Sequence, residues 1–289
     1  MRPIELELGV IAQAAGSARL HIGATDVIVG VKVEVASPSP FAPTQGRLGV
    51  TVEFSPCASP VYQGRFGETY GEQIAAAIEA SLAPSGRAGG AAAAAAAATA
   101  AAANGGAAGA SSSGSAGAAG AGGGPSWGLD LGKLCISAGK TAWALYVDAL
   151  VLNDDGNVVG AVSAATLAAL VDTRIPKVEV TTDAAGEEEI ELDDSPGAAW
   201  RLDVSRVPLV VTVAQVGSQC VVDLAAPEER CSSSALHVAV NRSGQVCGAT
   251  SSGRAGVEAS MLLAMTETAQ RIAPGLWEQL MRFLQSPAR

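Results

Sequence analysis

The fold of this chain is decided by residues 16–35, which read GSARLHIGATDVIVGVKVEV. Apolar residues alternate with polar ones from Ala18 to Ile22, and a second alternation runs from Val27 to Val35. Between them lies Gly23-Ala24-Thr25, where the glycine allows the chain to reverse direction. A period of two places every second side chain on the same face of a strand. The stretch therefore predicts a β-hairpin with one buried face.

The rest of the chain carries similar patterns. Further strands are predicted near 4–8, 48–54 and 142–152, with helices at 68–83 and 158–172. In the second half the patterns predict strands at 178–182, 189–192 and 200–204, hairpins at 209–224 and 236–250, and a helix at 257–284 with a kink at Pro274. Strands followed by helices in both halves indicate an α+β fold built from two similar β-rich units.

One segment lacks the side chains that a core requires. Residues 84–126 consist almost wholly of alanine, glycine and serine, and Arg87 is their only charged residue. Side chains of this size bury too little apolar area to offset the entropy of ordering the chain. We therefore expect a disordered insertion, which the fold tolerates because a long loop adds little closure entropy.

The charge of the chain argues against a free-standing nucleic-acid binder, because the formal net charge is −10. Acidic residues concentrate in 183–229, which holds eleven Asp and Glu against two arginines, whereas 230–289 carry six arginines and three glutamates. An acidic edge and a basic edge suit docking between charge-complementary subunits. An ordinary solvated surface explains the same distribution, and the sequence leaves both explanations open.

Cysteine and histidine usage argues against metal or covalent chemistry. The five cysteines form no C-x-x-C pair, and Cys220 and Cys247 lie in apolar strands, where we expect buried free thiols and hence a reducing, intracellular compartment. The only histidines, His21 and His237, occupy alternating strand positions, so neither a zinc site nor a Ser-His or Cys-His nucleophile is expected. No apolar run is long enough to span a membrane, and the residues after Met1 do not open a signal peptide.

In its wording the hairpin resembles the opening hairpin of ribonuclease PH-type subunits, which reads G-S-A, a short strand, G-x-T and a hydrophobic strand. Arg174-Ile175-Pro176 matches that family in wording and spacing as well. Within the family the likeness is greatest to non-catalytic ring subunits of the eukaryotic RNA exosome. The resemblance implies a ribonuclease PH-like fold, a duplicated unit similar to ribosomal protein S5 domain 2. Its phosphorolytic domain 1 would span 1–176, interrupted by the insertion 84–126, and its domain 2 would span 200–284.

Family members carry a helix and a D-G-R stretch before the first strand. Here the chain starts at Met1-Arg2-Pro3, inside that strand. We therefore expect either a longer form of the chain that carries this element or a form that lacks it.

Active members of the family use inorganic phosphate to attack the 3′-terminal phosphodiester of RNA. Their phosphate cradle, a Gly-Thr-Arg or Gly-Ser-Arg turn that opens a helix, corresponds here to Gly156-Asn157-Val158-Val159. Asn157 and Val158 provide neither the hydroxyl nor the arginine, so the resemblance implies that both catalytic positions are vacated. Asp154 and Asp155 precede the helix, where we expect them to cap it and to repel a phosphate dianion.

The acidic element of active members is incomplete as well. They carry an E-E-D stretch and a further aspartate before the next strand. Here Asp223 starts the stretch, Glu229 ends it, and Ala235 occupies the place of the second aspartate, which is thus a third vacated position. A methyl group neither binds a metal ion nor accepts a proton, so we expect no metal site. We expect Asp223 and Glu229 to be ordinary loop acids.

The arginine-rich stretch that active members carry before the first helix is reduced to Arg65. Arg65, Arg47 and Lys32 are candidate RNA contacts, since a cation can bind a phosphate group. Isolated cations of this kind bind phosphate weakly and in a salt-dependent way. Phe66 and Tyr70 follow closely in the sequence. They either stack on a base or pack the helix against the sheet.

These losses predict a non-catalytic structural subunit of the exosome ring that uses no cofactor. By resemblance, its partners are the other ribonuclease PH-like subunits of a hetero-hexameric ring and the cap subunits, with RNA reaching it through the assembled channel. The expected processes are 3′–5′ RNA processing and degradation, including rRNA maturation and RNA surveillance, in the nucleus, nucleolus and cytoplasm, and no membrane partner is expected. Two alternatives are an active phosphate-dependent 3′–5′ exoribonuclease and a generic RNA-binding module.

Overall fold

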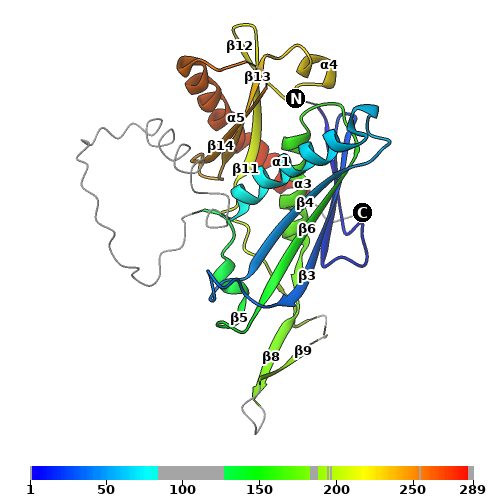
Figure 1. Cartoon of the computed structure of the whole chain (residues 1–289), viewed down its shortest axis with the longest axis vertical. Helices are drawn as coiled ribbons and strands as arrows, with labels where there is room; N and C mark the ends of the chain where they lie inside the picture. Colours follow the sequence, from blue (N-terminus) through cyan, green and yellow to red (C-terminus); the bar gives the residue numbers. More distant parts are fainter. Residues whose placement is uncertain are drawn as a thin grey trace, which may run out of the picture.

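The computed structural model describes residues 2–83, 127–182, 188–193, 195, 197–253 and 255–285. Within these ranges the chain forms an α+β fold in which two main sheets are packed with three long helices (Figure 1). The insertion at 84–126 lies outside the described residues, so its expected disorder stays a prediction.

The hairpin predicted from residues 16–35 is confirmed and lies within the first sheet. Its strands β2 (Gly16–Ile22) and β3 (Thr25–Ala36) pair antiparallel, and their inward side chains, such as Val27 and Val29, are fully buried. The sheet has the order β1-β2-β3-β6-β4, with β5 paired to β6 off this path. Its other strands are β1 (Ile4–Leu8), β4 (Arg47–Phe54), β5 (Cys135–Ser137) and β6 (Thr141–Asn153). Among the described strands of this sheet, β4 and β6 run parallel, and the other pairs run antiparallel.

Two helices cover one face of this sheet. Helix α1 (Arg65–Leu82) packs on β4, and a Cβ at Gly71 would lie 2.3 Å from the Val52 carbonyl oxygen. Helix α3 (Val158–Asp172) is buried on nearly all sides because it contacts β2 and β3 of the first sheet and β11 of the second. Among the described residues no helix covers the opposite face, which we call the open face.

The second sheet has the order β12-β11-β13-β14 and is entirely antiparallel. Its strands are β11 (Leu209–Val216), β12 (Gln219–Val222), β13 (Ser234–Val240) and β14 (Val246–Gly253). Helix α5 (Ala259–Gln285) covers one face, where Met265 and Ala269 pack against Val213 and Leu236. The short helix α4 (Ala226–Glu229) connects β12 to β13.

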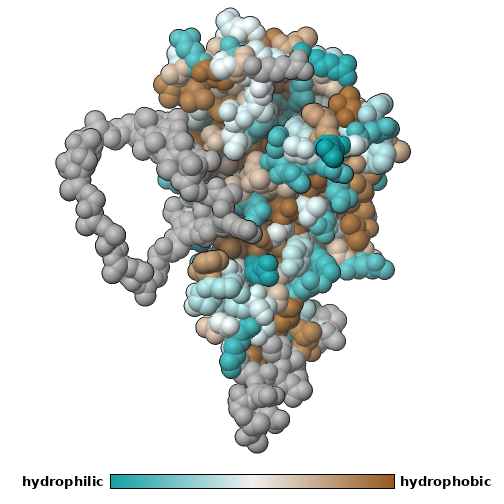
Figure 2. Space-filling view, viewed as in Figure 1, coloured by the Kyte–Doolittle hydropathy of each residue, from teal (hydrophilic) through white to brown (hydrophobic). Residues whose placement is uncertain are grey.

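Smaller elements complete the described chain. They are two 3-10 helices, η1 (Pro60–Tyr62) and η2 (Leu131–Leu134), and two strand pairs, β7 (Arg174–Ile175) with β10 (Trp200–Arg201) and β8 (Lys177–Thr182) with β9 (Glu188–Asp193). The β8–β9 hairpin projects from one end of the molecule (Figure 1). Figure 2 shows hydrophobic surface where that hairpin leaves the body. No helix in the described part of the chain is both long and apolar enough to cross a membrane.

Two sequence-based expectations are corrected by the structure. Helix α1 starts at Arg65, because Gly64 turns the chain into the helix with a φ of 79°. Helix α5 continues through the exposed Pro274 as one helix, and the kink expected there stays a prediction. Cys220 and Cys247 are free but only half-buried, since they lie on the two edge strands of the second sheet.

Candidate functional site

The turn between β6 and α3 occupies the place where a phosphate cradle was expected. Gly156 and Asn157 both adopt left-handed backbone conformations there, with φ values of 85° and 55°. A Cβ at Gly156 would lie 2.4 Å from the Leu224 carbonyl oxygen, so only glycine fits at this position. The turn is therefore held closely against the loop that follows β12.

The amide groups of this turn are already bound within the chain. The N–H of Asp155 donates to Thr25 Oγ1 at 3.0 Å, and the N–H of Gly156 donates to Asp154 Oδ1 at 2.8 Å. The N–H of Asn157 donates to Glu229 Oε1 at 2.6 Å. Amide groups at a helix start attract anions, and here the bound anion is a carboxylate of the same chain.

Arg2 fastens three segments together at this turn. Its guanidinium donates twice to Asp223 Oδ1, at 2.9 and 3.2 Å, and its backbone N–H donates to Asp223 Oδ2 at 2.7 Å. The same guanidinium donates to the carbonyl oxygens of Asp155 at 2.6 Å and of Gly156 and Leu224 at 3.2 Å. The Arg2 side chain is 17% exposed and that of Asp223 only 4%, so solvent screens this ion pair little.

The two acidic residues of the loop differ in their electrostatics. Burial alone would raise the pKa of Asp223, but the bonds from Arg2 and Asn157 outweigh it and hold that pKa below its usual value. The Glu229 residue is exposed overall, yet its carboxyl group is turned inward. Burial raises the pKa of this carboxyl group, although the hydrogen bond from the Asn157 N–H lowers it. Asp154 and Asp155 add to that rise through charge repulsion. The turn thus carries an excess of negative charge that disfavours a phosphate dianion.

Aromatic rings close the other side of the turn. The Tyr62 hydroxyl donates to Asp154 Oδ2. Burial is the main cause that raises the pKa of Tyr62, and this hydrogen bond is the second. The Tyr62 ring stacks on Phe54 at 4.1 Å between centroids and lies nearly parallel to Tyr70, whose pKa burial raises to about 12. Phe66 lies at the outer end of this group, 6.0 Å from Tyr70 and 57% exposed. Tyr70 packs the helix, whereas Phe66 leaves much of its ring open.

The three positions expected to be vacated have different surroundings. Asn157 is the N-cap residue of α3 but makes no capping bond, and neither Asp154 nor Asp155 caps the helix as we had expected. Its Nδ2 donates to Asp223 Oδ1 at 3.2 Å, while its Oδ1 is buried with no hydrogen-bond partner beside a narrow, mostly apolar cavity of about 50 Å³. That volume admits water and is far too small for a nucleotide.

The other two positions expected to be vacated are Val158 and Ala235. Val158 is buried in the first turn of α3, and Ala235 lies on β13 opposite Ala214 and Ser252.

His237 makes a pair of hydrogen bonds that the sequence did not predict. Its Nδ1 lies 3.0 Å from Thr212 Oγ1 and its Nε2 lies 2.9 Å from Ser252 Oγ. Burial lowers the pKa of His237 to about 4. A catalytic base works best with a pKa near the working pH, so this histidine is poorly suited to activate Ser252.

The candidate RNA contacts do not converge. Lys32 and Arg47 point to the open face of the first sheet, where Lys32 is paired with Glu34 at 2.5 Å. Arg65 is exposed at the start of α1, which packs on the opposite face. The structure therefore offers three separate cations rather than one basic groove.

Arg2, Thr25 and Tyr62 were missed by reasoning from the sequence. Each acts through a contact with residues at least 92 positions away, at the turn before α3. Asp223, in contrast, was named from the resemblance, and the structure gives it a φ of 56°, which is uncommon for a residue other than glycine but tolerated by aspartate.

Comparison with protein families identifies the class. Residues 1–176 match domain 1 of the 3′ exoribonuclease family, named RNase_PH, and residues 206–272 match domain 2 of the same family. The chain belongs to the 3′ exoribonuclease (RNase PH) family.

Homologues of this chain include Rrp42 proteins. The exosome complex component Rrp42 of Methanopyrus kandleri is 31% identical over 85% of this chain and 74% of its own length. An RRP42 protein of Dictyostelium discoideum, whose name describes an exosome complex exonuclease, is 35% identical over 93% of this chain and 85% of its own length.

Solved structures share the fold. A chain of the Archaeoglobus fulgidus exosome, solved with RNA bound to the active site, has a TM-score of 0.67 and 24% identity, covering 96% of this chain and 88% of that one. Rice Rrp46 has a TM-score of 0.59 and 13% identity, covering 99% of this chain and 96% of that one. The ribonuclease PH-like fold expected from residues 16–35 is therefore confirmed.

Proposed function

We propose that this chain is a non-catalytic subunit of an RNA exosome ring. The observation that carries the proposal is the turn before α3, where the N–H of Asn157 is bound by Glu229 and that of Gly156 by Asp154. A phosphate nucleophile needs such donors free and cations beside them. Here the nearby guanidinium of Arg2 is committed to Asp223 and to backbone carbonyl groups.

The position of Ala235 supports the same proposal. Catalysis by this family requires an acidic group that holds a metal ion or moves a proton, and a methyl group does neither. Asp223 does not replace it, because its carboxylate is nearly inaccessible and bound by Arg2 and Asn157. With donors and acids both committed, the chain retains the scaffold of the family without its reactive groups.

In the proposed role, the chain pairs with other ribonuclease PH-like subunits and cap subunits, and contributes to a channel through which RNA reaches an associated nuclease. The processes are 3′–5′ RNA processing and degradation, including rRNA maturation and surveillance. The proposal places the protein in nucleus, nucleolus and cytoplasm, which imaging of a fluorescently tagged chain tests. The names of the Rrp42 homologues support the assembly part of this role.

Assembly is tested by expressing the chain alone and together with the other ribonuclease PH-like subunits of its organism. We expect aggregation of the isolated chain and a soluble hetero-hexamer with its neighbours, both measured by light scattering. Exposed apolar side chains such as Val61, Phe66 and Leu192 favour association of the isolated chain. A stable, soluble monomer that ignores these subunits would contradict the proposed role.

The second candidate function is an active phosphate-dependent exoribonuclease. Two observations favour it: the family is named for 3′ exoribonucleases, and the Dictyostelium relative is named as an exonuclease. It requires the Glu229 carboxylate to leave the Asn157 N–H and a cation to enter in its place. Release of nucleoside diphosphates from RNA by the isolated chain distinguishes this function from the proposed one.

A further inference from the structure

The open face of the first sheet contains a cleft of about 620 Å³. Its floor is formed by β3, β4 and β6, and the loop between β1 and β2 borders it through Ile11 and Ala14. Gly30 deepens the floor, because a Cβ at this position would lie only 3.3 Å from the Ile11 side chain. The cleft is separate from the turn before α3, because that turn leads into a helix on the covered face and the cleft lies on the open face.

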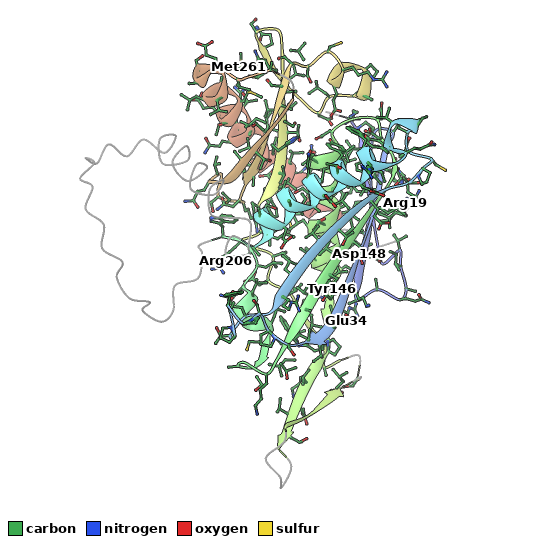
Figure 3. The ribbon with its side chains drawn as sticks, viewed as in Figure 1. Arg19, Glu34, Tyr146, Asp148, Arg206 and Met261 are labelled. Carbon is green, nitrogen blue, oxygen red and sulfur yellow. The ribbon has the colours of Figure 1, made fainter. Side chains whose placement is uncertain are left out.

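The floor of the cleft combines apolar and acidic side chains. Ile28 and Leu150 are neighbours across β3 and β6, and Leu150 is 38% exposed. Glu53 lies beside Leu150 on β4, and Asp148 lies one row further along β6, next to Thr51. Figure 3 shows Asp148 on this face, in a column of labelled residues with Arg19 above it and Tyr146 and Glu34 below.

Of the cations on this face, Arg47 lies outside the lining of the cleft, and the two nearer ones are already committed. Arg19 is bound to Asp26 at 2.8 Å, and Lys32 is bound to Glu34 at 2.5 Å. Asp148 also interacts with the charge of Lys32, but more weakly than Glu34 does. Among the described residues, no hydrogen bond or ion pair to the side chain of Asp148 or Glu53 is found. Both carboxylates are therefore stable in water but costly to bury without a cation. A partner that covers the cleft must bring positive charge.

We infer that this cleft receives a projecting segment of a neighbouring ring subunit, in which an apolar side chain stands beside a lysine or arginine. The inference rests on the proposed function, because it assumes that such neighbours exist. The apolar side chain fills the space over Ile28 and Leu150, while the cation neutralises Asp148 and Glu53. RNA does not suit this cleft, since its phosphates would meet these two carboxylates.

Photo-crosslinking in the co-expressed ring tests the inference. Benzoylphenylalanine replaces Thr51 on the cleft floor, and in a matched control it replaces Thr69, an exposed threonine on α1. We expect the Thr51 variant to crosslink to a neighbouring ribonuclease PH-like subunit, within a peptide that contains lysine or arginine. A crosslink to RNA or to a second copy of this chain, or none in an assembled ring, would overturn the inference.

Charge reversal supplies a second measurement. The double variant Glu53→Lys/Asp148→Lys should reduce incorporation into the ring at least about tenfold, because two like charges then meet the partner's cation. The control Glu68→Lys/Glu72→Lys makes the same charge change on exposed positions of α1 and should assemble as the wild type does. Normal incorporation of the cleft variant refutes the docking site alone, whereas failure of the wild-type chain to assemble refutes both the docking site and the proposed function.

Discussion

At the residue scale, the guanidinium of Arg2 stabilises a half-buried group of acids that would otherwise repel each other. Arg2→Ala leaves the Asp223 carboxylate, whose side chain is 4% exposed, without its cation. We expect a loss of about 3 kcal/mol in the free energy of unfolding, measured by urea denaturation. Arg65→Ala is the control, because Arg65 is exposed at the start of α1, and it should change stability by less than about 0.5 kcal/mol. Equal stability of the two variants would contradict this stabilising role of Arg2.

His237 gives a prediction about pH. Its pKa is about 4 in the folded protein and 6.5 as a reference value, so the unfolded chain binds more protons between these values. Stability should therefore fall as the pH is lowered from 6.5 to 4, and this one residue contributes up to about 3 kcal/mol to the fall. His237→Gln keeps hydrogen-bonding capacity without this titration, so the slope of stability against pH should flatten in that window. An unchanged slope would show that His237 is not buried in its neutral form.

At the element scale, the packing of α1 on β4 depends on Gly71. Alanine normally favours a helix over glycine by about 1 kcal/mol. At position 71, however, a Cβ would lie 2.3 Å from the Val52 carbonyl oxygen, so Gly71→Ala should destabilise the protein by about 3 kcal/mol. Gly275→Ala is the matched control in α5, since nothing lies within 4 Å of its added Cβ, and it should stabilise by up to about 1 kcal/mol. Thermal unfolding of both variants checks the opposite signs.

The elements themselves were largely predictable from the sequence, because their patterns are local. Alternation with a period of two located β2 and β3, and turn residues located the hairpins β11–β12 and β13–β14. The start of α3 at Val158 was predicted as well, since Asp154-Asp155-Gly156-Asn157 signals a turn before a helix. How that turn is used was not predictable, because the contacts from Arg2, Thr25 and Glu229 come from distant parts of the chain.

At the scale of the whole molecule, the covered and open faces of the first sheet have separate roles. The covered face, with α1 and α3, builds the core and holds the acids at the turn before α3. The open face keeps a cleft and two unpaired carboxylates exposed to solvent in the described chain. The proposed loss of catalysis and the proposed docking surface therefore depend on different parts of the molecule, and variants of Glu53 and Asp148 should affect assembly without altering the turn.

The proposal that this chain has no phosphorolytic centre is tested most directly by an RNA assay. Soluble chain, separated from aggregate by gel filtration, is incubated with RNA that has a single-stranded 3′ end, inorganic phosphate and Mg²⁺, and the nucleoside diphosphates released are measured. We predict no release above a protein-free control, because the Asn157 N–H is bound by Glu229 and Ala235 provides no acid. Phosphate-dependent release above that control would contradict this prediction.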